Sequence, residues 1–395
     1  MITTKSFKSN TPTDLFIILQ RFQPIARADL ATISGLTRAA VTNSVKSLLN
    51  IGAIREIGKK SNGVGRKKIQ LRVKEDFLHV IGTDLGRRHI SVSLYNSAGD
   101  LLNKETKVFD DVRTLQENLK CSKEMIKDML GYARKNKMEV EGIGVGVPGP
   151  VDPDKGVVMC APHYKDSETV NIKESIEEVT GIPVFVERDA NAAALGEQLF
   201  GIAKKYDSFV YLLVVEGIGA GIVIDSNLYR GVNGLAGKVG RFVFPNLDNG
   251  GVFSLEDYGS EISALTMAEE SANKLKHGTL FNLLKTRKPG VSDLIDAFRD
   301  GDKAALEVVE RMSYYTAIAV SNIILFIDPS LVIIGGDFVE VSDGFVDSIK
   351  NKMKDILKNR PLPELVASPI YDKSIALGAA TRTMIELVMR KISRG

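Results

Sequence analysis

Residues 184–197 read VFVERDANAAALGE, and the structural preference changes in the middle of this stretch. Residues 184–186 are β-branched or aromatic and favour a strand, whereas those after Asp189 are rich in alanine and favour a helix. At such a turn the Asp189 carboxylate can cap the helix, whose dipole helps to keep it ionised. It can also act as a base, because strand-to-helix turns hold side chains at the mouths of α/β clefts. The local sequence favours the cap and leaves both interpretations open.

The overall composition is that of an ordinary soluble globular protein, with 44% hydrophobic and 26% charged residues in a chain of 395. This length indicates two or three domains. No apolar run approaches the ~20 residues of a membrane span, and the N-terminus lacks the apolar core of a signal peptide. The two cysteines, Cys121 and Cys160, form neither a disulfide framework nor a zinc-ligand spacing. We therefore expect a cytoplasmic protein with no membrane partner.

The net charge of +3 is distributed unevenly along the chain. Residues 1–75 contain 14 Lys or Arg and 4 Asp or Glu, whereas residues 76–395 contain 38 and 45. Blocks of opposite charge indicate two parts with different partners, and the basic block is a candidate for binding nucleic acid. A solvated basic face explains the charge equally well, so the charge alone does not decide.

Three helices are predicted within the basic block. The first follows Pro12 and has apolar residues at helical spacing, the second spans residues 27–34 and stops at Gly35, and the third is capped by Thr37. Two helices joined by a tight turn that contains Gly match the helix-turn-helix pattern. The outward face of the third helix carries donors and acceptors suited to phosphates and base edges, namely Arg38, Thr42, Asn43 and Lys46.

Two alternating runs, residues 54–57 and 68–73, predict a pair of strands after these helices. The loop between them is rich in Gly and cations, and we expect Arg66 and Lys67 to reach the DNA backbone or minor groove. Helix order, polar face and cationic loop together favour a winged helix-turn-helix domain that binds double-stranded operator DNA. A helical protein-interaction module is the alternative.

From His79 onward, the pattern changes to strands alternating with helices. Residues 80–86 and 90–95 are expected to form a strand, a Gly turn and a second strand, and residues 209–215 and 222–224, with the Gly-rich turn 216–221 between them, repeat this unit about 130 residues later. The repeat indicates a duplicated α/β fold with a cleft between two lobes. A further buried strand ends at Gly335-Gly336, and a final helix is expected near Ile375.

Five segments resemble the motifs of the ROK family and occur in the family's order along the chain. This family contains bacterial sugar kinases and sugar-responsive repressors on the actin-like ATPase fold. Residues 84–86, with Asp84 and Gly86, are similar to its first phosphate motif, and residues 216–221, with Gly217 and Gly219, to its second. Residues 188–191 are similar to its catalytic segment, residues 231–241 to its sugar signature, and residues 328–336 to its adenosine-side strand. The resemblance covers nearly the whole chain, because the repressor branch carries an N-terminal winged helix-turn-helix.

The resemblance implies a winged helix-turn-helix over residues 1–75, followed by a ROK body over residues 76–395. The body is expected to be a duplicated, ribonuclease H-like α/β fold with two actin-like lobes. One lobe takes about residues 76–195 plus the C-terminal helix, and the other about residues 196–375. The effector site is expected in the cleft between them.

The phosphate motifs depart from the pattern of the family's kinases. Arg88 and Glu216 each stand where those kinases usually have Thr. A carboxylate at ~4 Å from a phosphate charge is unfavourable by about 4 kcal/mol before screening. An ion pair between Arg88 and Glu216 would offset part of this. The departures argue against ATP binding, and we expect no enzyme activity.

The sugar signature also departs from the family's usual Gly-Glu-x-Gly-His, in which Glu contacts the sugar and His binds a structural zinc. Lys238 and Arg241 stand at those two positions. The family's three cysteine ligands correspond by spacing to Leu247, Asn249 and Ser254. Because a tetrahedral zinc site needs nitrogen or sulfur ligands, we expect no zinc.

The resemblance implies an effector-binding set of Arg188, Asp189, Asn233, Gly234, Lys238, Arg241 and Glu256. Arg188 replaces the Asn that commonly precedes the family's catalytic Asp. The three cations either pair internally with Asp189, Glu216 and Glu256, or form a pocket for an anionic or unusually substituted polyol, or point outward. His163, in a predicted loop, is a further candidate contact.

We therefore predict a DNA-binding transcriptional repressor of carbohydrate utilisation that responds to a sugar, polyol or sugar derivative. It is expected to act as a homodimer or higher homo-oligomer, without cofactors. Asp189 is expected to cap its helix and to hold an effector hydroxyl or a cation, as a vestige of the catalytic base. The alternatives are an ATP-dependent sugar kinase with an added DNA-binding domain, and a ligand-independent architectural DNA binder.

Overall fold

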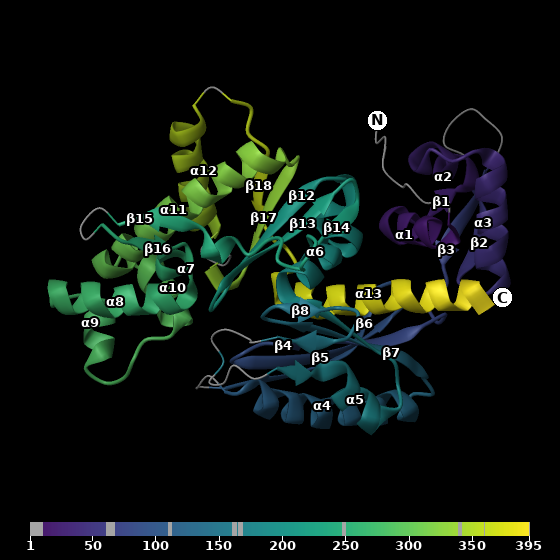
Figure 1. The fold of residues 1–395 in the computed structure, drawn as a ribbon, viewed down its shortest axis with the longest axis horizontal. Coiled ribbons are helices and arrows are strands. Elements are labelled where there is room, and N and C mark those ends of the chain that lie inside the picture. Colours follow the sequence, from purple (N-terminus) through teal and green to yellow (C-terminus); the bar gives the residue numbers. More distant parts are fainter. Residues whose placement is uncertain are drawn as a thin grey trace. The chain divides into compact units, whose positions relative to one another are not determined.

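The computed structural model describes residues 11–60, 68–109, 113–159, 164, 169–246, 250–338, 342–358 and 360–394. The chain divides into two compact units, whose elements are labelled in Figure 1. The first unit consists of Met1–Asp207, Val223–Leu228 and Asp372–Gly395. The second consists of Ser208–Ile222 and Tyr229–Tyr371. The two phosphate-like motifs therefore lie in different units: Asp84 is in the first unit and Glu216 is in the second.

The three helices predicted at the N-terminus are confirmed as α1 (Pro12–Phe22), α2 (Arg27–Ser34) and α3 (Arg38–Asn50). Thr11 and Asp14 form a capping box at the start of α1. The Thr37 hydroxyl accepts a hydrogen bond from the Ala40 N–H at 3.2 Å and caps α3. Gly35 ends α2 in the left-handed conformation that Gly adopts without strain.

A small antiparallel sheet follows, in the order β1 (Ile25–Ala26), β3 (Lys68–Val73) and β2 (Ile54–Lys60). The two predicted strands are confirmed, and β2 continues three residues beyond its predicted end. Exposed ion pairs from Arg27 to Glu56 at 2.8 Å and from Lys68 to Asp29 at 2.9 Å join α2 to these strands. Residues 61–67, which include the predicted DNA contacts Arg66 and Lys67, lie outside the described residues. We call residues 11–73 the N-terminal domain.

A five-stranded mixed sheet forms the centre of the first unit, in the order β11-β7-β4-β5-β6. Helices α4 (Leu115–Lys135) and α5 (Ile172–Thr180) lie on one face, and α13 (Tyr371–Arg394) lies on the other (Figure 1). Glycines in the sheet let α13 approach closely, since a Cβ added at Gly82 would lie 2.0 Å from the Ala376 carbonyl oxygen. The strands are β4 (His79–Leu85), β5 (His89–Asn96), β6 (Leu101–Val108), β7 (Val140–Val147) and β11 (Val184–Arg188).

Shorter elements complete the first unit. A three-stranded sheet contains β8 (Val151–Asp152), β9 (Val157–Val158) and β10 (Val170–Asn171). After β11 come α6 (Asp189–Phe200) and the 3-10 helix η1 (Ile202–Lys205). The change from strand to helix predicted within residues 184–197 is therefore confirmed, with the boundary between Arg188 and Asp189.

A second five-stranded sheet, in the order β14-β13-β12-β17-β18, confirms the predicted repeat of the strand–turn–strand unit. Its strands are β12 (Phe209–Val214), β13 (Ile218–Ile224), β14 (Asn227–Tyr229), β17 (Leu331–Gly335) and β18 (Glu364–Ala367). The larger helices of the second unit are α8 (Glu261–Leu275), α10 (Val291–Arg299), α11 (Lys303–Ile327) and α12 (Ser342–Leu357). Smaller elements are η2 (Val239–Arg241), β15 (Val243–Pro245), β16 (Val252–Ser254), α7 (Glu256–Gly259) and α9 (Thr279–Leu284).

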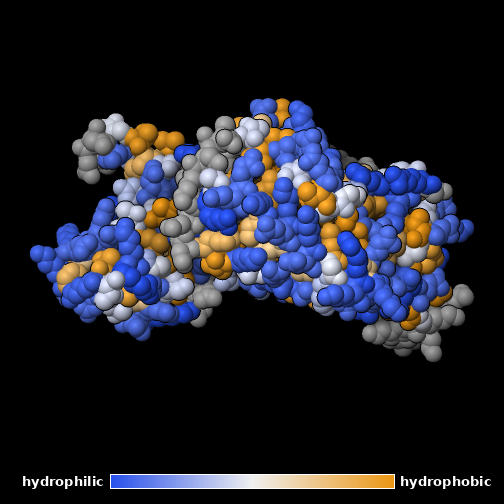
Figure 2. All heavy atoms as spheres, turned by 90° about the horizontal axis from the view of Figure 1, so that it is seen from below, coloured by the Kyte–Doolittle hydropathy of each residue, from blue (hydrophilic) through white to orange (hydrophobic). Residues whose placement is uncertain are grey.

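Each unit has its own hydrophobic core. The core of the first unit lies between the sheet and helices α4 and α5, and that of the second joins its strands to α8, α11 and α12. The molecular face drawn in Figure 2 is mostly hydrophilic, with hydrophobic side chains in small groups. Among the described residues, every helix is too short or too polar to cross a membrane. The domain boundary predicted at residue 75 stays a prediction.

Candidate DNA-binding surface and effector site

The outward face of α3 carries the four residues predicted to contact DNA. Arg38, Asn43 and Lys46 are exposed, and their spacing places them on one side of the helix. Thr42 is half-buried, and its hydroxyl donates to the Arg38 carbonyl oxygen at 2.8 Å. The Thr42 hydroxyl proton is therefore already engaged, which leaves the other three side chains as the available donors.

Asp189 is the first residue of α6, and the prediction that it is the helix cap is wrong. The N-cap is Arg188, whose side chain makes no capping bond, because α6 begins at Asp189, one residue earlier than the cap prediction requires. The Asp189 carboxylate instead accepts a hydrogen bond from the adjacent Ala190 N–H at 2.7 Å. Burial raises the pKa of Asp189, and the Arg188 charge and the Ala190 N–H oppose this rise.

Arg188 lies in a buried polar network that sequence reasoning did not find. Its side chain donates to Asn191 Oδ1 at 2.9 Å, and Asn191 donates to Glu187 Oε1 at 2.9 Å. Glu187 is 2% exposed and forms an ion pair with Arg382 of α13 at 3.1 Å. A charged residue inside a buried strand was the available signal, because such a group needs a partner. The outward orientation considered for Arg188 is wrong, since this residue is only 5% exposed.

The first phosphate-like turn follows β4 and is fixed by side chains from other elements. His89 Nε2 lies 2.8 Å from Asp84 Oδ2, so the carboxylate is engaged within its own hairpin. Asn118 of α4 donates to the carbonyl oxygens of Gly86 and Arg87 at 2.9 and 3.1 Å. A Cβ added at Gly86 would lie 2.5 Å from the His89 ring. No local pattern singles out His89, because the contact depends on the register of β4 and β5.

Arg87 is a further residue that the sequence interpretation missed. It is buried, its guanidinium lies 6.0 Å from the centre of the Tyr164 ring, and its charge is among those that lower the pKa of Asp189. The first unit therefore brings Asp84, Arg87, Arg188 and Asp189 into one electrostatic neighbourhood. His163 lies outside the described residues.

The second unit holds the remaining predicted effector residues. Glu256 accepts a hydrogen bond from the Ile218 N–H at 3.0 Å, and its other oxygen lies 3.8 Å from Arg241 Nε. Glu256 therefore supports the second phosphate-like turn, in which Gly217 and Gly219 flank Ile218. Asn233 is exposed, and Gly234 and Lys238 are half-buried. The cleft predicted to join the two sets of residues stays a prediction.

The positions that hold zinc in the family do not offer zinc ligands in the part of the chain that the structure describes. Arg241 supplies a guanidinium and Ser254 a hydroxyl, whereas structural zinc takes thiolates and imidazoles. Leu247 and Asn249 lie outside the described residues. The residues present therefore do not fit this metal.

Aromatic rings support the β15–β16 hairpin next to these positions. The ring of Phe253 stacks on that of Phe244, with 5.5 Å between the ring centres. It meets the rings of Tyr258 and Tyr315 edge-on, with 4.7 and 5.1 Å between the ring centres. Tyr258 and Tyr315 stack on each other at 4.9 Å. Such pairs stabilise by about 0.5–1.5 kcal/mol each beyond the burial of their area. The aromatic cluster thus connects the hairpin to α7 and α11.

Replacing Phe253 by Ala is expected to destabilise the protein by about 2–3 kcal/mol, less than for a fully buried ring because Phe253 is half-buried. Phe326→Ala, at a side chain that is 91% exposed, is the matched control and should change stability by less than about 0.5 kcal/mol. Urea unfolding measures both. Dialysis against EDTA should leave the midpoint unchanged, and a fall in the midpoint would show that a metal holds the hairpin.

The comparison with known proteins places these features in one family. The ROK family model matches residues 80–384. The xylose repressor of Caldicellulosiruptor bescii is 28% identical over 381 residues, which cover 92% of each chain. The glucokinase of Thermotoga maritima is 31% identical and covers 77% of this chain and 96% of its own. The crystal structure of a ROK family transcriptional regulator, described as a homologue of the Escherichia coli MLC protein, shares the fold with a TM-score of 0.78. It is 23% identical, with 97% of this chain and 98% of that chain covered.

Proposed function

The chain belongs to the ROK family, and we propose that it is a sugar-responsive transcriptional repressor whose N-terminal winged helix-turn-helix binds operator DNA. The similarity to the xylose repressor covers 92% of this chain, so it extends beyond residues 80–384 into the N-terminal domain. The observation that carries the proposal is the exposed face of α3, where Arg38, Asn43 and Lys46 meet solvent together. Readers of this kind bind two half-sites, so we propose a homodimer or higher homo-oligomer.

We propose a neutral aldose or polyol as the effector, with D-xylose as the first candidate because relatives are named xylose repressors. Arg188 and Arg241 each have a polar or acidic partner in their own unit, Asn191 and Glu256. These contacts support the interpretation in which the cations pair with groups of the protein, in preference to the one in which they form a pocket for an anionic ligand. In the first unit, the Asp189 carboxylate then offers an acceptor to sugar hydroxyls.

Kinase activity is not part of the proposed function. The Asp84 carboxylate is engaged by His89, and a carboxylate at position 216 opposes the binding of a polyphosphate. The relatives named xylose repressor and the N-acetylglucosamine repressor of Escherichia coli agree with a regulatory role. ADP release above background with any sugar, lost in Asp189→Asn, would revive the kinase alternative.

The proposal is tested by fluorescence anisotropy with DNA from the chain's own upstream region. We expect a Kd that rises steeply with salt, because each phosphate contact releases counterions. D-xylose, D-glucose and N-acetylglucosamine are then titrated into the complex, and at least one should release the DNA. Binding that is weak, insensitive to salt and unchanged by all three sugars would contradict the proposal.

Asp189→Asn is expected to weaken sugar binding by about 10- to 100-fold, because hydrogen bonds to a charged acceptor contribute about 1.5–3 kcal/mol. Calorimetry with D-xylose measures the loss, and Asp154→Asn, at an exposed turn, is the matched control. The ionised carboxylate is the better acceptor, and burial raises the pKa of Asp189. The affinity should therefore fall as the pH falls through this raised pKa, and an affinity that does not change with pH in the wild type would contradict this role.

A further inference from the structure

The N-terminal domain is anchored to the rest of the first unit by Arg21, at the end of α1. The guanidinium is fully buried and donates to the carbonyl oxygens of Lys204 and Tyr206 at 2.9 and 3.3 Å and to the Ser226 hydroxyl at 3.2 Å. It also lies 3.6 Å from Asp207 Oδ1. A buried guanidinium is costly unless its donors are matched, so this contact favours one relative position of the two parts.

A second anchor lies one residue earlier, at Gln20. Its side-chain amide donates to the carbonyl oxygen of Ser97, in the turn between β5 and β6, at 2.9 Å. Ser97 is fully buried, and its hydroxyl accepts from the Leu78 N–H at 2.6 Å and donates to the Leu78 carbonyl oxygen at 3.1 Å. The same turn therefore holds both α1 and the segment that leads into β4.

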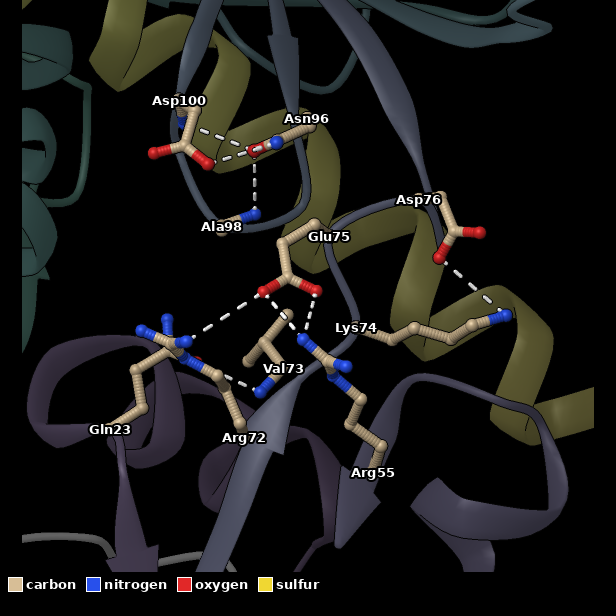
Figure 3. A network of polar contacts seen from close by, with 10 residues as sticks. All are labelled: Gln23, Arg55, Arg72, Val73, Lys74, Glu75, Asp76, Asn96, Ala98 and Asp100. Atoms are coloured by element: carbon tan, nitrogen blue, oxygen red, sulfur yellow. Dashed lines mark hydrogen bonds and ion pairs between the residues drawn. The ribbon is translucent and has the colours of Figure 1, made fainter. Parts of the chain in front are cut away.

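The connecting segment, residues 74–78, is itself held at Glu75. Figure 3 shows Arg55 and Arg72 pointing at this carboxylate from β2 and β3. The distances are 2.9 Å from Arg55 Nη2 and 3.9 Å from Arg72 Nη1. The Glu75 carbonyl oxygen accepts from the Ser97 N–H at 3.2 Å. Because the segment has bonds on both sides, it does not act as a free tether.

The C-terminal end of α6 meets the same surface. Gln198 donates to the Ser226 carbonyl oxygen at 2.8 Å, and the Ser226 hydroxyl joins Arg21 to Asp207. Phe200 lies against the turn that contains Ser97, where a Cβ added at Gly99 would lie 2.2 Å from its ring. We call Gln20, Arg21, Ser97, Phe200 and Ser226 the junction.

The other end of α6 carries Asp189. The helix has 12 residues and is therefore about 18 Å long. Its residues Ala190–Leu199 are buried, and at Gly378 the backbone of α13 lies so close that an added Cβ would be 1.6 Å from the Ala192 carbonyl oxygen. A helix packed this tightly shifts as a rigid body more readily than it bends.

We propose that α6 relays effector binding at Asp189 to the DNA-binding domain through the junction. This relay rests on the proposed function and adds the route by which effector binding reaches the DNA-binding helices. Sugar binding displaces α6 along its packed surface, and the displacement reaches α1 through Ser226 and Phe200. Arg21 and Gln20 then change the position in which α3 is presented to the operator. The sugar can shift α6 only to the extent that it binds the protein more tightly with the helix in one position than in the other.

The relay is tested by measuring how strongly sugar weakens operator binding by the full chain. The factor is the Kd for operator DNA with sugar divided by the Kd without sugar. D-xylose is the probe, with D-glucose and N-acetylglucosamine in parallel, on upstream DNA. We expect a factor of at least about 10 in the wild type. Arg21→Gln should reduce the factor to below about 3, while sugar-free DNA binding and DNA-free sugar binding keep their affinities. By reciprocity, DNA should then also cease to weaken sugar binding.

Two further variants make the result decisive. Ser226→Ala removes only the hydroxyl that joins Arg21 to Asp207, so it should fold and also lower the factor, and it decides the matter if Arg21→Gln does not fold. Arg134→Gln, at an exposed position of α4, is the matched control and should keep the wild-type factor. If the junction variants keep the wild-type factor, the proposed relay is wrong and the proposed repressor function still stands. A wild type that ignores all three sugars overturns both.

Discussion

Replacing Arg38, Asn43 and Lys46 together by Ala is expected to weaken operator binding at least about 100-fold, because each base or phosphate contact contributes about 1–3 kcal/mol. All three side chains are exposed on α3, and their loss leaves the packing of the N-terminal domain unchanged, since the buried face of α3 is made by Val41, Val45 and Leu48. The variant should unfold at the same urea concentration as the wild type. The change therefore reports recognition and not folding.

The single variants separate two kinds of contact. Lys46→Ala is expected to lower the salt dependence of the Kd by about one unit of slope and to weaken all sequences alike, as loss of a phosphate contact does. Asn43→Ala should instead weaken the operator more than unrelated DNA, since amide side chains read base edges. Lys135→Gln, at an exposed position of α4, is the control for charge alone. Equal affinity of the triple variant and the wild type would place the DNA contact elsewhere on the chain.

The three N-terminal helices and the repeated strand–turn–strand unit were predictable from the sequence because they depend on short-range patterns. Thr37, the spacing of Val41, Val45 and Leu48, and Gly35 fix α3 and its turn locally. The alanine-rich run after Arg188 likewise fixes the start of α6. The role of Asp189 as a cap was wrong by one residue, which lies within the uncertainty of any helix boundary drawn from composition.

The contacts that connect these elements were not predictable in the same way. Glu187 pairs with Arg382, and Arg21 with Ser226 and Asp207, across about 200 residues of chain. No periodicity records such a pairing, since it depends on which faces of two folded elements meet. The polar residues Gln20 and Arg21 at the end of α1 fit a solvated helix face equally well in the sequence. Only the fold shows them to be buried.

Gly378→Ala is expected to destabilise the protein by about 3–5 kcal/mol, beyond the usual range for an overpacked side chain. The added Cβ would lie 1.6 Å from the Ala192 carbonyl oxygen and 3.0 Å from the Gly196 N, so it meets backbone and not a flexible side chain. Relief requires α6 and α13 to separate. Because α6 carries both Asp189 and the contacts to α1, the variant should also weaken sugar binding in the fraction that still folds.

Gly131→Ala in α4 is the matched control, and its expected effect has the opposite sign. A Cβ at this position meets no atom within 4 Å, and the helix backbone favours Ala over Gly by about 0.5–1 kcal/mol. Urea unfolding of both variants therefore compares the same chemical change in two helices. The close crossing of α6 and α13 predicts a fall in the midpoint for Gly378→Ala and a rise for Gly131→Ala. Two changes of the same sign and size would show that α6 and α13 are not in backbone contact, and α6 could then move without α13.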